Sequence, residues 1–383
     1  MSWKTVALGE LCEILDSKRK PITKKDRTTG KYPYYGATGI VDYVGDFIFN
    51  EKLVLIGEDG AKWDSGDMTA FIAEGEYWVN NHAHVIKPLH NLLLDEWLVY
   101  YFYYKDLKEF VTGLTVPKLN QGQLKTIPIP LPPLPIQQKI VARLDAIFAE
   151  IDKATTAAEA NAENAEALFQ SYLTQVFERD SEGWETNLLG KITKFIDYRG
   201  KTPTKTDSGV RLITAKNVKF GYLNKEPYEY IAEEDYVGWM TRGIPEKGDI
   251  LFTTEAPLAN VAQLDTEEKV VFAQRLIILQ PKKDVLDKEF LKFSLLSRKV
   301  QKEIISKGTG ATVKGIKASL LKLIPIEYPS LKEQREICRK LFVVDFEANK
   351  MKFSYLSKVS NLSLYKQSIL KKAFNGELVN EQQ

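Results

Sequence analysis

Two runs of basic residues are the part of this sequence best suited to binding anionic groups. Each run lies among turn-forming glycines and prolines and carries a single acid, Asp26 or Asp207. The cations are Lys18, Arg19, Lys20, Lys24, Lys25, Arg27 and Lys31 in segment 17–31, and Arg199, Lys201, Lys205, Arg211, Lys216 and Lys219 in segment 199–219. Either run alone is typical of a solvated surface loop. Because the first, third and fourth cations of the first run recur 181 residues later as the first three cations of the second, we expect both loops to contact phosphate groups.

A second group of polar and aromatic residues lies in other predicted loops of both halves. Lys, Arg, Asn and Gln have the donor geometry that fits the edges of DNA bases, and Gly permits close approach of the backbone. The further candidates for DNA contact are Tyr34, Tyr35, Lys62, Asn80, Asn81, His82 and Lys118 in the first half, and Thr202, Lys216, Asn217, Gln274, Arg275 and Lys314 in the second. Ordinary loop polarity explains most of these residues one by one, so the prediction depends on their grouping.

The sequence has no signature of a catalytic or metal site. It lacks a glycine-rich phosphate loop, the Asn-Pro-Pro-Tyr or Asp-Pro-Pro-Tyr tetrapeptide of amino-methyltransferases, a Gly-x-Ser-x-Gly elbow and a zinc-binding cysteine set. His82 and His84 alternate along a predicted strand, which places both imidazoles on one face but supplies no third or fourth ligand. We therefore predict no chemistry, no metal and no cofactor in this chain.

The composition predicts ordinary globular material for two or three domains. The 383 residues are 44% hydrophobic and 27% charged, which lets each domain bury a core and argues against disorder. No apolar stretch reaches the length of a signal peptide or a membrane span, so we expect a soluble cytosolic protein. Cys12 and Cys338 are expected to be buried thiols. The net charge of +2 is small, so we expect weak DNA binding by the chain alone.

The second half of the chain repeats the first half in kind and order. Segment 127–132 recurs 197 residues later as 324–329, and the same shift aligns Gln137 with Gln334. Near the front of each half the shift is only 181, as between Trp3 and Trp184, so the second module carries extra loop residues. A repeat on this scale fixes the architecture before any single residue is interpreted. It predicts two related modules with different surfaces, suited to reading two different short targets.

Each half ends in a predicted long helix with a coiled-coil seam. Apolar or small residues recur at alternating steps of three and four, which is the 3.5-residue repeat of paired helices. The predicted packing positions are Ile140, Leu144, Ile147, Ile151 and Ala158 in the first helix, and Ile337, Leu341, Val344, Met351, Tyr355 and Leu362 in the second. The same phase puts Asn161, Leu168 and Lys358 in the seam. If the helices pack antiparallel, the Ala-rich middle of the first lies beside the bulky middle of the second.

Between these landmarks the pattern predicts mixed α+β modules. Strands are expected near 53–56, 69–73 and 83–87 with a helix near 94–109, and then near 210–214, 249–253 and 270–279 with a helix near 287–306. Proline clusters before both long helices predict stiff extended leads. The predicted division is module 1–133, helix 134–180, module 181–330, helix 331–376 and tail 377–383.

The order and duplication of these fragments resemble the specificity subunit of type I restriction-modification systems over essentially the whole chain. The strongest fragments are segment 127–140 with its repeat 324–337, and the tail 367–378. The openings 8–11 and 189–192 and the segments 34–40 and 81–85 also resemble this family. The first helix lacks the Gly-Glu-Leu that closes the second, a departure that bears on symmetric docking of partners at that end.

The resemblance implies two target recognition domains separated by two long helices that pack as an antiparallel coiled coil, with a pseudo-twofold internal repeat. It further implies a bipartite asymmetric site on double-stranded DNA, two methyltransferase subunits around the helices and two restriction motor subunits in the full complex. S-adenosylmethionine, ATP and magnesium would then bind those partners. This chain would be a non-catalytic recognition subunit.

Modules related by a pseudo-twofold axis would enter the major groove on one face of the duplex, with half-site centres about 10 base pairs apart. About five to seven unread pairs would then lie between half-sites of ordinary size. Two other classes stay open at this point. One is a self-sufficient DNA methyltransferase or nuclease with an unrecognised catalytic site, and the other is an adaptor whose two modules bind protein or glycan.

Overall fold

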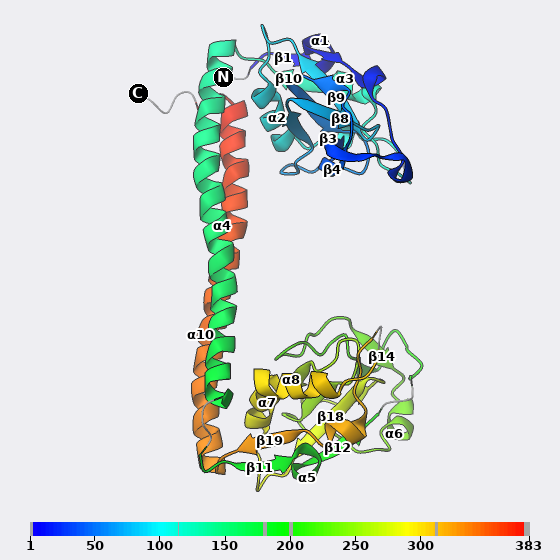
Figure 1. The fold of residues 1–383 in the computed structure, drawn as a ribbon, viewed down its shortest axis with the longest axis vertical. Helices are drawn as coiled ribbons and strands as arrows, with labels where there is room; N and C mark the ends of the chain where they lie inside the picture. The colour runs from blue at the N-terminus through cyan, green and yellow to red at the C-terminus, as the bar shows by residue number, and fades with distance from the viewer. Residues whose placement is uncertain (1–2, 114, 179–181, 199–201, 311–312, 379–383) are drawn as a thin grey trace. The chain divides into compact units, whose positions relative to one another are not determined.

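The computed structural model describes residues 3–113, 115–178, 182–198, 202–310 and 313–378 (Figure 1). By their contacts the residues form two compact units. Unit 1 comprises Met1–Ala160 and Tyr355–Gln383, and unit 2 comprises Asn161–Ser354. Each unit thus contains one module together with part of both long helices. The predicted division, in contrast, treats each helix as a separate segment.

Module 1 is built from two four-stranded sheets that share a core. The first has the order β2 (Cys12–Ile14), β9 (Ala83–Pro88), β6 (Leu53–Gly57), β7 (Ala70–Ala73), and the second has the order β4 (Gly39–Val44), β3 (Thr29–Gly36), β8 (Glu76–Val79), β5 (Phe49–Asn50). Side chains alternate along β6, so Leu53 and Leu55 pack in the core with β8, while Val54 and Ile56 face helix α2 (Asp95–Tyr104). With both faces covered, β6 is a continuous apolar run, which is why its sequence predicted a strand.

Module 2 repeats this plan. A four-stranded sheet has the order β12 (Thr193–Asp197), β18 (Leu276–Pro281), β15 (Ile250–Thr253), β16 (Val261–Gln263), and a three-stranded sheet has the order β14 (Glu229–Ile231), β13 (Val210–Ile213), β17 (Val270–Phe272). Ile250 and Phe252 face helix α7 (Lys288–Leu296), and Leu251 faces the other core. The central strand β15 therefore occupies the position that β6 has in module 1.

Smaller elements complete the repeat. The proline leads form short edge strands: β10 (Pro128–Pro130) pairs with β1 (Thr5–Ala7), and β19 (Pro325–Tyr328) pairs with β11 (Glu185–Leu188). The remaining short helices are α1 (Leu8–Leu11), α3 (Gln121–Thr126), α5 (Leu189–Ile192), α6 (Asp235–Trp239), α8 (Arg298–Lys307) and α9 (Ala318–Leu321), and the 3-10 turns are Asp16–Lys18, Lys24–Asp26 and Lys108–Phe110.

Two predicted elements of module 2 are each divided in the structure. The strand expected near 270–279 is β17 and β18, which belong to different sheets. Arg275 lies between them with a φ of 76°, which an extended strand cannot contain. The helix expected near 287–306 is α7 and α8, because Ser297 has an extended backbone and its side chain caps α8.

The long helices are α4 (Leu134–Glu178) and α10 (Leu331–Phe374), and they pair antiparallel. In unit 1 the start of α4 lies beside the end of α10 (Figure 1), and Leu144 shares a core with Leu370. In unit 2 the end of α4 shares a core with the start of α10, as Leu173 does with Leu341. The predicted antiparallel helix pair is confirmed.

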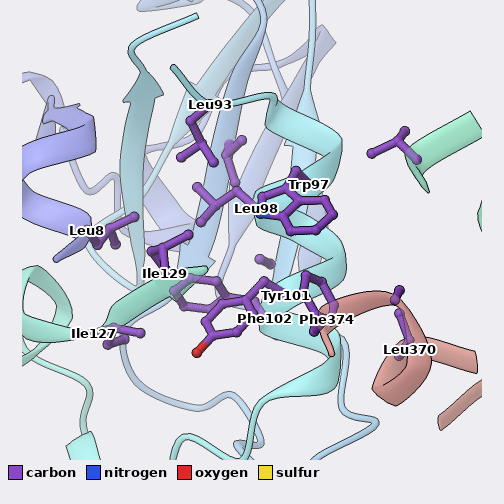
Figure 2. Packing of buried hydrophobic residues seen from close by; sticks show 14 of the residues in the cluster. Leu8, Leu93, Trp97, Leu98, Tyr101, Phe102, Ile127, Ile129, Leu370 and Phe374 are labelled. Atoms are coloured by element: carbon purple, nitrogen blue, oxygen red, sulfur yellow. The ribbon is translucent and has the colours of Figure 1, made fainter. Parts of the chain in front are cut away.

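The end of α10 is anchored in the core of module 1. Figure 2 shows Phe374 against α2, where its ring centroid lies 4.8 Å from that of Trp97 and 5.2 Å from that of Tyr101. The end of α4 makes the equivalent contact in unit 2, with the Phe177 and Phe290 rings 5.4 Å apart. Aromatic pairs of this kind add directional packing to the burial of apolar area.

The seam has the predicted period but partly the wrong phase. Ile140, Leu144, Ile151, Ala158, Ile337 and Leu341 are buried, and Ile147, Val344, Tyr355 and Leu362 are half-buried. Met351 is 41% exposed, and Asn161, Leu168 and Lys358 are also exposed. Ala162 is buried in place of Asn161. From Ile151 onward the seam of α4 therefore steps by four and then three. One of the two predicted heptad positions was assigned correctly along both helices, and the other was correct only near the start of each helix.

No helix in the described part of the chain is long and apolar enough to span a membrane. Cys12 and Cys338 are both buried thiols, as expected. Burial raises the pKa of each thiol to about 12.

Candidate DNA interface

Three loops meet in the same way in both modules. In module 1 the Glu58 amide donates to the His82 carbonyl at 2.8 Å, and the Leu119 amide donates to the Glu58 carbonyl at 2.8 Å. In module 2 the amides of Thr254 and Ile316 make the same pair of bonds, to the carbonyls of Arg275 and Thr254, each at 2.9 Å. We name residues 58–62, 80–82 and 112–118 loop cluster 1, and residues 254–259, 274–275 and 309–315 loop cluster 2. Residues 114, 311 and 312 lie outside the described residues.

The third loop of each cluster is a closed turn that requires glycine. Thr112 and Lys118 exchange backbone hydrogen bonds, as Thr309 and Gly315 do. Gly113 and Gly310 have φ values of 96° and 117°, and an added Cβ would lie within 2.4 Å of a backbone oxygen in each loop. Both turns have the sequence Thr-Gly-x-Thr-Val, 197 residues apart. This repeat is visible in the sequence, although it was not used to predict the DNA contacts.

Loop cluster 2 concentrates the backbone strain of the molecule. Among the described residues, the non-glycine residues with positive φ are Ala256, Ala259 and Arg275, at 48°, 67° and 76°. All three lie in loop cluster 2. A conformation that costs about 1–3 kcal/mol persists only where the surroundings impose it, and such residues gather at binding sites. The strain therefore marks loop cluster 2 as a preformed surface.

A positive and a negative side chain of loop cluster 2 line an open cavity of about 470 Å³. Arg275 Nε lies 3.1 Å from Glu255 Oε1, and both side chains are nearly half exposed. Gln274 also lines the cavity, and its Oε1 accepts a hydrogen bond from Thr202 Oγ1 at 2.9 Å. A guanidinium and an amide can together present paired donors and acceptors to a base edge.

Loop cluster 1 has different side chains at the equivalent positions. His82 replaces Arg275 and contacts Asp59, which replaces Glu255. Asn81, which replaces Gln274, is exposed. Lys118 Nζ lies 2.9 Å from Glu58 Oε1. The two clusters share one backbone frame but present different hydrogen-bonding groups.

A partly buried ion network underlies loop cluster 1. Arg19 Nη1 lies 2.5 Å from Glu58 Oε2, and His84 Nδ1 lies 2.6 Å from Asp16 Oδ2. Burial raises the pKa of both carboxyls, but the opposing interactions outweigh it. Hydrogen bonds from Arg19 and Lys118 hold the pKa of Glu58 below its usual value, and His84 does the same for Asp16.

Asp16, Glu58 and His84 bring ligand atoms within 4.8 Å of one another, which is close enough for a metal ion. Two cations, Arg19 and Lys118, already contact Glu58, and both nitrogens of His84 have partners. The arrangement therefore suits an ion-pair network better than a metal ion. His82 and His84 do not share a site, since His82 is exposed beside Asp59 whereas His84 is buried.

Four predicted DNA contacts need correction because their side chains are used inside the protein. Tyr34 is 1% exposed, and its hydroxyl accepts from the Ile22 amide at 3.0 Å. Asn217 is fully buried and holds the loop 214–227 through bonds to backbone atoms. Asn80 is 6% exposed and caps the His82 amide. Arg19 is partly buried, and its guanidinium is paired with Glu58 in the ion network.

The other predicted contacts lie at or near the surface. Lys18, Lys20, Lys24, Lys25, Lys62, Thr202, Lys205, Lys216 and Lys314 are exposed, and Tyr35 is half-buried. Glu229 accepts a hydrogen bond from Lys205 at 2.7 Å and lies 4.0 Å from Lys216. Arg199 and Lys201 lie outside the described residues.

Comparison with known proteins gives one consistent result. Residues 1–162 and 181–354 match the model of the type I restriction modification DNA specificity domain. A putative type I restriction enzyme specificity subunit from Haemophilus influenzae is 29% identical over 88% of this chain and 86% of its own length. The MjaVIII specificity subunit of Methanocaldococcus jannaschii is 24% identical over 90% of this chain and 86% of its own length.

Solved structures share the fold. A chain from a structure of type I restriction-modification complex assembly has a TM-score of 0.75 at 20% identity, with 98% of each chain covered. The HsdS subunit of Thermoanaerobacter tengcongensis has a TM-score of 0.54 at 19% identity, with 98% of this chain and 97% of that chain covered.

Proposed function

Because the chain belongs to the family of type I restriction-modification DNA specificity domains, it is a DNA sequence-recognition subunit, and we propose that each module reads one half of a bipartite asymmetric site. Loop cluster 1 reads one half-site and loop cluster 2 reads the other. The observation that carries this assignment is the shared backbone frame of the two clusters, which holds different side chains at equivalent positions. Equal frames with unequal side chains suit two half-sites of different sequence.

Gln274 and Arg275 read the bases in module 2, and Asn81 and His82 read the bases in module 1. These pairs are exposed, and they occupy equivalent positions before strands β18 and β9. The exposed lysines of segments 17–31 and 202–219 contact phosphates, which position a module without selecting bases. The half-site centres lie about one helical turn apart on the duplex.

The helix pair carries the partner subunits. Phe342, Phe346 and Phe353 are 55%, 61% and 76% exposed, and spacings of four and seven residues place them on one side of α10. Exposed apolar stripes of this kind mark protein interfaces. Two methyltransferase subunits dock along the helices, and two restriction motor subunits join in the full complex.

The chain itself performs no reaction in this proposal. S-adenosylmethionine binds the methyltransferase subunits, and ATP and magnesium bind the motor subunits. The role of this chain is to supply two recognition surfaces and the helix pair. In this proposal the protein acts in the cytoplasm.

The test is methylation mapping with the complex of this chain and its companion methyltransferase. Substitution of both Gln274 and Arg275 by Ala should relax one half-site only, because a good bidentate contact contributes about 1–3 kcal/mol of discrimination between bases. Substitution of both Asn81 and His82 by Ala should relax the other half-site only. Lys283→Ala, at an exposed residue beyond the opposite end of strand β18 from Arg275, is the matched control. Relaxation of both half-sites by one double variant would contradict the assignment.

A further inference from the structure

Two glutamines are fully buried at equivalent places in the two repeats. Gln137 and Gln334 each lie three residues after the first residue of a long helix, and each has 0% exposure. A buried amide is unfavourable unless its polar atoms are bonded, so the repetition of such a residue calls for a structural reason.

The two side chains make the same three hydrogen bonds. Gln137 Oε1 accepts from the Leu94 amide at 3.0 Å, and its Nε2 donates to the carbonyls of Leu92 and Pro132, each at 2.8 Å. Gln334 Oε1 accepts from the Asp287 amide at 2.8 Å. Its Nε2 donates to the carbonyls of Val285 at 3.0 Å and Pro329 at 2.8 Å.

These bonds join three segments in each unit. Leu94 and Asp287 are the N-cap residues of α2 and α7, the helices that cover the central sheets. Pro132 and Pro329 belong to the proline leads, two residues before α4 and α10 begin. Each glutamine therefore ties the covering helix of a module to the first turn of the long helix that follows it.

Hydrogen bonds at this place fix an orientation that apolar packing would leave free. Apolar surfaces can slide or rotate against each other at little loss of contact, whereas three bonds from one planar amide define an orientation. Loss of the side-chain amide would also leave one backbone N–H and two backbone carbonyls in the interior without these partners, which is unfavourable for each group.

We infer that Gln137 and Gln334 are positioning residues that fix the angle between each module and its long helix, and thereby select the gap length between the two half-sites. The second part of this inference rests on the proposed function. The first part concerns each unit by itself and can be tested without DNA.

The orientation is measured by pulsed electron paramagnetic resonance on the full chain. Spin labels are placed at Lys25 in module 1 and at Glu159 on α4, both exposed residues of unit 1, with Cys12 and Cys338 replaced by Ala. Gln137→Met keeps the length of the side chain and removes its bonds. We expect a broader distance distribution in this variant and no change in Gln138→Met, which alters the exposed neighbouring glutamine.

The gap is measured by methylation of DNA whose half-site spacing is one base pair longer or shorter than the preferred one. We expect the double variant Gln137→Met, Gln334→Met to raise the rate on misspaced DNA, relative to correctly spaced DNA, by about tenfold, the ratio that corresponds to loss of about 1.4 kcal/mol of discrimination. Gln138→Met should leave the ratio unchanged.

Each outcome decides one part of the inference. An unchanged distance distribution in folded Gln137→Met would overturn the positioning role. A broadened distribution with unchanged spacing preference would overturn the link to gap selection. A wild-type complex that methylates no bipartite site would contradict the proposed function, and the resonance measurement would still decide the positioning role. If Gln137→Met does not fold, Gln137→Glu serves instead, since a carboxyl buried beside two carbonyls is protonated and keeps the acceptor for the Leu94 amide but only one of the two donors.

Discussion

His84 is the central residue of the network beneath loop cluster 1. Its Nδ1 faces the Asp16 carboxylate at 2.6 Å and its Nε2 faces the Leu119 carbonyl at 2.7 Å. Both ring nitrogens therefore lie at hydrogen-bond distance from an oxygen, which fixes the orientation of the ring. Strand pairing places Ile277 at the equivalent position of module 2, where Thr254 replaces Glu58. Module 2 therefore lacks the histidine and the glutamate of this network at the two equivalent described positions.

The lowered pKa values of Asp16 and Glu58 predict a loss of stability in acid. Each carboxyl has a lower pKa in the folded chain than in the unfolded chain, so it stabilises the fold above the unfolded value and loses that contribution as the pH falls through the folded value. We expect Glu58→Gln to lower the Tm at pH 7, and the difference from wild type to shrink as the pH falls below 4.5, the usual glutamate value.

Thermal unfolding between pH 7 and pH 3 measures this effect. Glu159→Gln, at an exposed position on α4, is the matched control and should follow wild type throughout. A Glu58→Gln protein as stable as wild type at pH 7 would show that the network contributes nothing to the fold.

At the residue scale, the sequence predicted which charged side chains are exposed better than it predicted which polar side chains form bonds inside the protein. The exposed lysines of segment 17–31 were assigned correctly as surface residues because a free charge is rarely buried. Tyr34, Asn80 and Asn217 were misassigned, since an amide or hydroxyl that bonds to backbone inside a loop has the same sequence signature as one that bonds to a base. The repeated Thr-Gly-x-Thr-Val turn would have located the loop clusters.

At the scale of elements, the long helices were the most predictable part of the fold. Their heptad spacing and proline leads define both helix starts, and the internal repeat supports each assignment with the other. The phase of the seam was harder to predict, because neither Asn161 nor Ala162 is a large apolar residue and the choice between them depends on the partner helix. The division between β17 and β18 depends on Arg275 alone, and the division between α7 and α8 depends on Ser297 alone. Hydrophobic periodicity does not report the backbone conformation of a single residue.

The seam gives a stability prediction for Ala158, which is 2% exposed. Ala158→Tyr forces a large ring into a filled position, and overpacking of this kind costs about 1–3 kcal/mol. We expect a lower midpoint in urea unfolding. Asn161→Tyr, at an exposed position three residues later on the same helix, should change the midpoint little. Equal midpoints for the two variants would place Ala158 outside the seam.

At the scale of the whole molecule, the function follows from duplication. One frame with two sets of loops provides two readers, and α4 and α10 each contribute to both units. The sequence predicted this plan because the repeat covers modules and helices together. It could not predict the bases that are read, since base choice depends on the placement of a few loop side chains and on DNA shape.

The central claim is that the modules choose the bases while the helix pair sets the gap between half-sites. Insertion of one heptad after Ala160 in α4 and one before Tyr355 in α10 lengthens both helices by about 10.5 Å, which corresponds to about three base pairs. Methylation mapping with the companion methyltransferase tests the claim most directly. We predict unchanged half-site sequences and a gap longer by about three base pairs. Altered half-site sequences, or an unchanged gap, would contradict the account.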